Sequence, residues 1–393
     1  MVTLGLTLGP VPRSTTWRAM VTPLASIIGS GFLICGPLLA REFGSAALAA
    51  MAALLVLAYA VGAVMRFNIA HVEPEAQDLA PHAPLAWAMR GGQVVLGLAY
   101  AVSVAYYLKL LAEFVLQRIP VPEALHALVA DTGVTVIILG FVALTFSGTI
   151  EKIEHAAHAS VSLKIGLIAG MLVGLAVWWV RHAGATPAAP PFKVGLASIP
   201  MLLGLLVTVQ GFETSRYLGD SYERDVRIRT MRMAQWVSSA IYLGFIALLT
   251  PFLGQAARTP GVAGILGIMT GVSALLGLFV LVGAAASQLS AAIADSIGAG
   301  GLVVEVSQRK LGVRGAFLLS SALSLAVVWL TDPLQVIALA SRAFALYYAV
   351  QAGLALWVAQ RTGAARGWAP RLGFIAVGLV CLAAAALGAP AEG

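Results

Sequence analysis

The sequence predicts an all-α polytopic membrane protein with about eleven transmembrane helices. Three observations predict this class: the hydrophobic content, the scarcity of charge and the length of the apolar runs. Of 393 residues, 60% are hydrophobic and only 10% are charged, whereas a soluble domain carries roughly 25% charged residues because its surface faces water. A chain of this composition cannot cover such a surface, so the sequence predicts a lipid bilayer as its surroundings.

Eleven apolar segments are long enough to cross a bilayer, since a spanning helix needs about 20 largely apolar residues. The ninth is the shortest and weakest. Residues 1–16 lack the features of a cleaved signal peptide, so we expect the first segment to remain as a span. The predicted spans are 17–39, 45–65, 93–119, 133–150, 156–180, 199–218, 235–253, 262–293, 316–330, 333–358 and 372–387.

The distribution of Lys and Arg predicts an orientation, because cytoplasmic loops carry an excess of both. With the N-terminus in the cytoplasm, fifteen of the 24 basic residues fall in cytoplasmic segments, five on the opposite side and four within spans. This bias also accounts for the net charge of +7 without a nucleic-acid partner. We therefore expect a multi-pass protein of the plasma (inner) membrane, with residues 66–92 as a cytoplasmic loop.

The first and sixth spans are interrupted by glycine and polar residues near their middle. Glycine weakens a helix, and an unpaired backbone group in lipid costs several kcal/mol unless protein, water or a ligand satisfies it. Small residues that permit close helix packing are the alternative explanation. The interruptions contain Ile28, Gly29, Ser30, Gly31 and Phe32 in the first span, and Val209, Gln210, Gly211, Phe212, Glu213 and Thr214 in the sixth.

Interrupted spans at matching positions of two halves indicate a transporter site. Their spacing predicts a single domain, residues 1–393, built as a five-plus-five repeat: 17–180, then 199–358, followed by an extra helix at 372–387. Free N–H groups at the half-helix N-termini can hold an anion such as a carboxylate, and freed carbonyls can hold a cation or an ammonium group. The predicted substrate-binding residues are Ile28, Gly29, Ser30, Gly31, Val209, Gln210, Gly211 and Phe212.

Four segments resemble the amino acid–polyamine–organocation (APC) superfamily of permeases, which have the leucine-transporter fold, an inverted five-plus-five repeat. Residues 28–32 resemble its Gly-Ser-Gly signature and 210–213 its Gly-Phe-Glu segment. Residues 160–166 resemble the span in which proton-coupled members carry a lysine, and 287–295 are similar to the family pattern in the eighth span.

The resemblance implies that the backbone of residues 29–31 binds a substrate carboxylate, and that residues 209–212 contact the amino group and side chain. It implies that Lys164 occupies the place of a sodium ion used by sodium-coupled relatives. This chain departs from the family in having eleven predicted spans where twelve are usual.

Two ionisable residues in the spans are predicted to take part in proton coupling. A charge at the bilayer centre costs at least about 2.5–3.5 kcal/mol, and Lys164 lies too deep in the fifth span to reach water easily. Such a lysine can gain and lose a proton as the site opens to either side; the alternative is a lysine permanently bonded to backbone carbonyls. Glu213 could relay protons or bind a cationic group, or could equally be a hydrogen-bonded acid that caps the second half-helix.

Three further charges in the spans are accessory candidates. Lys109 and Glu113 share a helix face, which favours an internal ion pair or an interhelical contact. Arg342 is expected to face the protein interior and to neutralise Glu113, Glu213 or an anionic substrate. At the start of the fifth span one helical face carries Glu151, Glu154, His155 and His158. That spacing could hold a metal, but a solvated helix end is the more common reason for it, so we predict no metal site.

These features predict a secondary active transporter, or permease, for amino acids or related amines. It would use alternating access, no cofactor and a proton as the coupling ion. No nucleophile–base set lies at membrane depth, so we predict no enzyme activity. No selectivity-filter sequence or nucleotide-binding loop is present either. The alternatives are a transporter of a different small solute and a non-transporting sensor relative.

Overall fold

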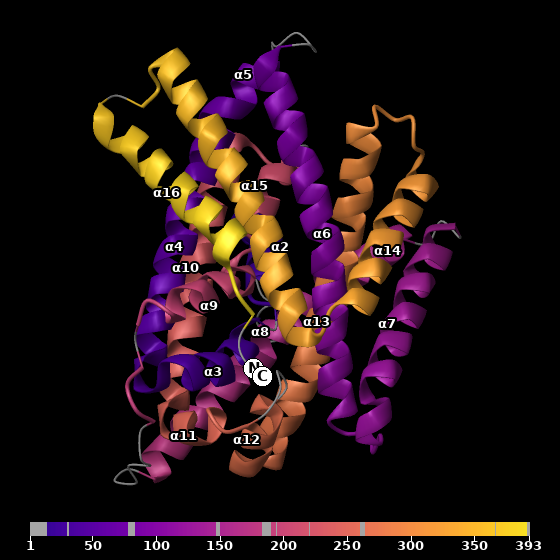
Figure 1. Ribbon diagram of the computed structural model, residues 1–393, viewed down its shortest axis with the longest axis vertical. Coiled ribbons are helices and arrows are strands. Elements are labelled where there is room, and N and C mark those ends of the chain that lie inside the picture. The colour runs from indigo at the N-terminus through magenta and orange to yellow at the C-terminus, as the bar shows by residue number, and fades with distance from the viewer. Residues whose placement is uncertain are drawn as a thin grey trace.

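A computed structural model describes residues 14–29, 31–77, 83–146, 150–182, 190–193, 195–219, 221–259, 264–365 and 367–390; within it the side chains of residues 150–162 are not described. The described residues form a bundle of long helices that run mostly along one axis (Figure 1). They contain no β-strand. The predicted all-α polytopic class is confirmed.

The interrupted spans appear as chains of short helices. The described residues contain nine helical segments that are long and apolar enough to cross a membrane. The first of them includes α2 (Thr15–Ile27), α3 (Gly31–Phe43) and α4 (Ala47–Phe67), which together cover the first two predicted spans. The sixth predicted span is divided into α9 (Ser198–Gly204) and the 3-10 helices η4 (Leu206–Val209) and η5 (Phe212–Leu218), each too short to be counted alone.

The other predicted spans are single long helices. They are α6 (Pro84–Leu116), α7 (Glu123–Phe146), α8 (Ile150–Arg181), α10 (Arg224–Leu249), α13 (Ala274–Val306), α14 (Val313–Leu330), α15 (Pro333–Thr362) and α16 (Trp368–Leu387).

The predicted start of the eighth span is wrong. Its first residues form a separate helix, α12 (Ile265–Val272), which packs against α13. The two helices are divided at Ser273, whose backbone is extended (φ −165°, ψ 137°) and whose Oγ accepts a hydrogen bond from the Leu275 N–H. A serine in this position ends one helix and caps the next. Hydropathy alone does not reveal this division into two helices, because α12 is as apolar as the span that follows it.

The predicted loop 66–92 is also largely helical. The α4 helix continues through a π-helical turn, η3 (Asn68–Val72), into α5 (Glu73–Gln77), and α6 already begins at Pro84. The extension is stable because Ile69 and Val72 are fully buried and the Asn68 amide donates a hydrogen bond of 2.9 Å to the Gln351 carbonyl.

Helices five predicted spans apart pack against one another. Helix α2 contacts η5 and α3 contacts η4, α4 contacts α10, α6 contacts α13, and α7 contacts α14. Contacts between non-equivalent spans also occur in matching pairs. The α2–α10 contact of spans one and seven matches the η5–α4 contact of spans six and two. The α8–α13 contact of spans five and eight matches the α15–α6 contact of spans ten and three. A five-plus-five repeat would produce this pairing.

The helix connections divide between two ends of the molecule. Helix α5, the α13–α14 turn and the α15–α16 turn lie at one end, and the α6–α7 turn, α11 (Leu253–Ala256) and α12 lie at the other (Figure 1). The first end, here named the α5 end, therefore gathers connections that the positive-inside pattern assigns to one side of the membrane.

Candidate functional site

The two helix interruptions lie directly against each other. A Cβ atom on Gly31, at the start of α3, would lie 2.5 Å from the Thr208 carbonyl oxygen. A Cβ atom on Gly211 would lie 2.5 Å from Ser26 Oγ, and the Gly211 φ of +122° is one that residues with a side chain rarely adopt. Both glycines are therefore needed for close approach of the two backbones. Ser30, which was predicted to bind substrate, lies outside the described residues.

Several of the backbone groups freed by the interruptions are already bonded within the protein. The buried Tyr242 hydroxyl, from α10, donates to the carbonyl oxygens of Ile27, at 2.9 Å, and Thr208. Cys35 Sγ lies 3.1 Å from Thr208 Oγ1. These contacts join α2, α3, η4 and α10, and the Tyr242 hydroxyl satisfies carbonyls that would otherwise be costly in lipid.

Lys164 lies beside the first interruption, in α8. Its side chain is only 2% exposed, and its Nζ donates a hydrogen bond of 3.3 Å to the Ala25 carbonyl in the last turn of α2. It forms no ion pair with any residue that the structure describes. A small cavity of about 20 Å³ adjoins it, lined also by Gly29 and by Ser287 of α13. Lys164 therefore contacts α2 beside the first interruption and shares the small cavity with α13.

Glu213 follows the second interruption and is fully buried. Its Oε2 accepts hydrogen bonds from the Gly211 N–H at 2.9 Å and from the Tyr348 hydroxyl at 2.8 Å. The Tyr348 ring in turn stacks on Phe212, with ring centroids 5.5 Å apart, and its hydroxyl lies 3.0 Å from Gln210 Oε1. Glu213 thus connects the start of η5 to α15.

A larger cavity, of about 440 Å³, lies between α2, η5 and α13. Its volume is in the range of small-molecule sites, roughly 300–1,000 Å³. It extends along α13 to Glu305, in the last turn of that helix at the α5 end. None of the predicted substrate-binding residues that the structure describes lines it. Its polar lining consists of Thr22, Ser26, Tyr100, Thr214, Tyr217, Ser290, Asp295 and Glu305.

Asp295 is the residue of this cavity that sequence reasoning missed, having noted it only as part of a family pattern. It is 5% exposed and accepts a hydrogen bond from Ser103 Oγ of α6. The signal was available: an aspartate inside a 33-residue apolar helix is costly in a bilayer and calls for a reason.

Lys109 and Glu113, the two accessory candidates in α6, each contact a residue of α7. Lys109 Nζ lies 2.6 Å from Asp131 Oδ1 of α7, and Glu113 Oε1 lies 4.0 Å from His126 Nδ1 of the same helix. Of the two predicted arrangements, the structure has the interhelical contact. No sequence pattern singles out Asp131 as the partner of Lys109.

The prediction for Arg342 is wrong. The residue is exposed, and its Nε donates a hydrogen bond of 2.6 Å to the Gly388 carbonyl at the C-terminal end of α16. It therefore does not face the interior or neutralise Glu113 or Glu213; a guanidinium at a helix C-terminus satisfies carbonyls left without helical partners. The side chains of Glu151, Glu154, His155 and His158 lie outside the described residues.

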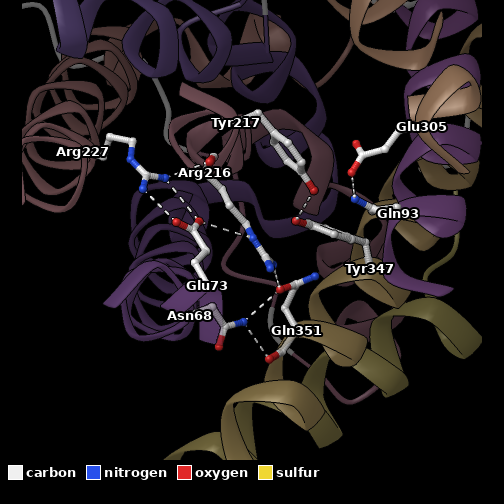
Figure 2. A network of polar contacts seen from close by, with 9 residues as sticks. All are labelled: Asn68, Glu73, Gln93, Arg216, Tyr217, Arg227, Glu305, Tyr347 and Gln351. Atoms are coloured by element: carbon white, nitrogen blue, oxygen red, sulfur yellow. Dashed lines mark hydrogen bonds and ion pairs between the residues drawn. The ribbon is translucent and has the colours of Figure 1, made fainter. Parts of the chain in front are cut away.

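A charged network lies at the α5 end, close to the cavity mouth (Figure 2). The Arg227 guanidinium donates to both Glu73 carboxylate oxygens, at 2.7 and 3.2 Å. Arg216 Nε lies 3.7 Å from Glu73 Oε1, and its Nη1 donates to Gln351 Oε1. Asn68 also donates to Gln351, at 2.9 Å. The network joins the helices that carry it: η3, α5, η5, α10 and α15.

Two further hydrogen bonds extend the polar contacts toward the cavity (Figure 2). The hydroxyls of Tyr217 and Tyr347 lie 3.2 Å apart, and the Gln93 amide donates to Glu305 at 2.7 Å. Tyr217 and Glu305 both line the cavity. No local sequence pattern predicts this network, because its members are far apart along the chain.

Comparison with known proteins places the chain in a family. A family model described as an APC superfamily transporter matches residues 9–388. A protein of Aquifex aeolicus (strain VF5), named only "Uncharacterized protein", is 36% identical over 346 residues, which cover 86% of this chain and 83% of the relative. The resemblance found in the sequence is confirmed, and the chain belongs to the APC superfamily of transporters.

Proposed function

We propose that this protein is a proton-coupled permease of the plasma membrane that carries a small amine or amino acid by alternating access. The observation that supports this most strongly is the pair of interrupted helices in mutual contact, beside a cavity that extends to one end of the molecule. Membership of a transporter family supports a role for that cavity in substrate passage and favours a function other than catalysis.

The cavity lies between two groups of packed helices. Helix α2 packs against η5 and α10, whereas α13 packs against α6, α8 and α14. Relative motion of these groups would close the cavity and open a path on the other side, which is the basis of alternating access. With the orientation that the basic residues predict, the present conformation faces the cytoplasm.

Lys164 is the residue to which we assign the coupled proton. It is buried, and the hydrogen-bond partner of its Nζ among the described residues is a neutral carbonyl, that of Ala25. A charged lysine with only that partner is costly at membrane depth. Loss of its proton would weaken the contact between α8 and α2, so protonation and the position of α2 would be linked.

The test is uptake of labelled amino acids and amines into proteoliposomes with an inward proton gradient. We expect wild type to accumulate a substrate against its gradient and Lys164→Ala to lose the dependence on the proton gradient. The matched control is Lys310→Ala, an exposed lysine in the α13–α14 turn, which should behave as wild type.

Each failure has a distinct meaning. If wild type accumulates no substrate under a proton gradient, the permease function is wrong. If Lys164→Ala is well folded by size-exclusion chromatography and still shows proton-driven accumulation, the assignment of Lys164 is wrong while the permease function stands.

A further inference from the structure

The large cavity is lined by acidic and hydroxyl groups. Asp295 and Glu305 are its two ionisable acids, and none of its lining residues within the described part of the chain is Lys, Arg or His. A cavity of one sign of charge in a low-dielectric setting concentrates ions of the opposite sign. The lining therefore favours a cation.

Asp295 is the deeper of the two acids and has no cationic partner among the described residues. Its side chain is 95% buried from solvent, with Ser103 as its hydrogen-bond donor. Lys164 of α8 and Arg216 of η5 have other partners: Lys164 donates to the Ala25 carbonyl, and Arg216 contacts Glu73 and Gln351. A carboxylate at membrane depth is costly without a counter-charge, and a cationic ligand would supply one.

The same cavity offers little to a substrate carboxylate. The N-terminus of α3 is the group expected to hold one, but Gly31 packs against the Thr208 backbone and does not line the cavity. A zwitterionic amino acid would place its carboxylate among acids and hydroxyls. An amine without a carboxylate avoids that repulsion.

We propose, on the basis of the permease function above, that the substrate is a net-cationic amine and that the Asp295 carboxylate binds its ammonium group. Ser103 is the positioning residue, since its hydroxyl holds one carboxylate oxygen of Asp295. Glu305 is exposed, accepts a hydrogen bond from Gln93 and attracts the cation at the mouth. The cavity of about 440 Å³ is large enough for a short diamine.

The experiment measures binding directly, by calorimetry on the detergent-purified full-length protein. The ligands are 1,5-diaminopentane and leucine, one dicationic and one zwitterionic. The variants are Asp295→Asn, Asp295→Glu and, as the matched control, Asp225→Asn, whose side chain is 87% exposed. We expect wild type to prefer the diamine and Asp295→Asn to bind it at least about tenfold more weakly, because a charge-assisted hydrogen bond is lost. Asp225→Asn should bind as wild type, and Asp295→Glu should retain more affinity than Asp295→Asn.

The inference is overturned if wild type does not bind the diamine, if it prefers leucine, or if a folded Asp295→Asn binds the diamine as wild type does. Should Asp295→Asn fail to fold, the comparison of wild type with Asp295→Glu and Ser103→Ala decides: unchanged diamine affinity in both overturns it. The permease function is tested separately by uptake. Uptake of leucine alone would reject this inference and keep the permease, whereas diamine binding without any uptake would keep the site and reject transport.

Discussion

Two regions of the molecule hold buried charge in opposite ways. In the network of Figure 2, Arg227 donates to both oxygens of Glu73, and Arg216 lies between Glu73 and Gln351. Asp295, in the wall of the large cavity, has a serine hydroxyl as its donor, and Lys164, beside the small cavity, has a carbonyl as its acceptor. The first set of charges is neutralised by the fold itself. The second set lacks a counter-charge in the described structure, which is the arrangement expected of groups that bind an ion or a proton.

The difference has a thermodynamic consequence. Removal of one partner from a buried ion pair leaves the other charge uncompensated and is strongly destabilising. Removal of a charge that never had a partner takes away a cost instead. The two regions should therefore respond to substitution with opposite sign.

The largest expected effect is on the network. Arg227→Ala leaves Glu73, 21% exposed, with the 3.7 Å contact to Arg216 as its one remaining ion pair among the described residues. We expect the free energy of unfolding to fall by about 3 kcal/mol, the lower end of the range for a broken buried pair. The measurement is the thermal unfolding midpoint of the purified protein.

Arg224→Ala is the matched control for that variant. Its 3.5 Å pair with Asp225 joins side chains that are 52% and 87% exposed, so its loss should change stability by less than about 1 kcal/mol. Equal unfolding midpoints for the two variants would show that the network stabilises the fold no more than an exposed ion pair does. The contrast between the two regions would then be lost.

A smaller effect is expected at the interruption that borders the cavity. Gly211→Ala introduces a side chain at φ +122° and against Ser26; left-handed strain of about 1–2 kcal/mol and local overpacking should together lower stability by about 2 kcal/mol. We also expect a lower rate of substrate uptake by the folded variant, because α2 and η5 must separate or shift to accommodate the added atom.

Gly244→Ala, in α10, serves as the comparison. A Cβ atom there meets no atom within 4 Å, so the substitution should be neutral or stabilising by about 0.5–1 kcal/mol. A Gly211→Ala protein as stable and as active as Gly244→Ala would mean that the contact between the interruptions is not required.

Local patterns predicted most of the fold. Composition, apolar runs and the positions of the glycines are properties of short segments, and they correctly predicted the helix class, the two interruptions and the family. The start of the eighth span was wrong because α12 and α13 are both apolar, and only the backbone at Ser273 shows that the chain turns back.

Side-chain partners were less predictable because they depend on which helix faces pack together. Lys109 pairs with Asp131, 22 residues away, in preference to the nearby Glu113. Arg342 was expected to face the interior, yet it lies on an exposed face of α15 and bonds to the end of α16. Asp295 carried a visible signal, its charge in an apolar helix, but its significance depends on a cavity that only three-dimensional packing creates.

The smallest expected effect on stability is at Asp295, and it is the sharpest test of the contrast between the two regions. Asparagine can still accept the Ser103 hydrogen bond, and it removes a charge that has no cationic partner among the described residues. In the absence of substrate we therefore expect Asp295→Asn to unfold at the same temperature as wild type or a higher one, while Arg227→Ala unfolds lower. Addition of 1,5-diaminopentane should then raise the midpoint of wild type more than that of Asp295→Asn, because a ligand stabilises only the state that binds it. If Asp295→Asn without ligand is destabilised as much as Arg227→Ala, then Asp295 is a structural charge like those of the network, and the cavity wall does not differ from it in kind.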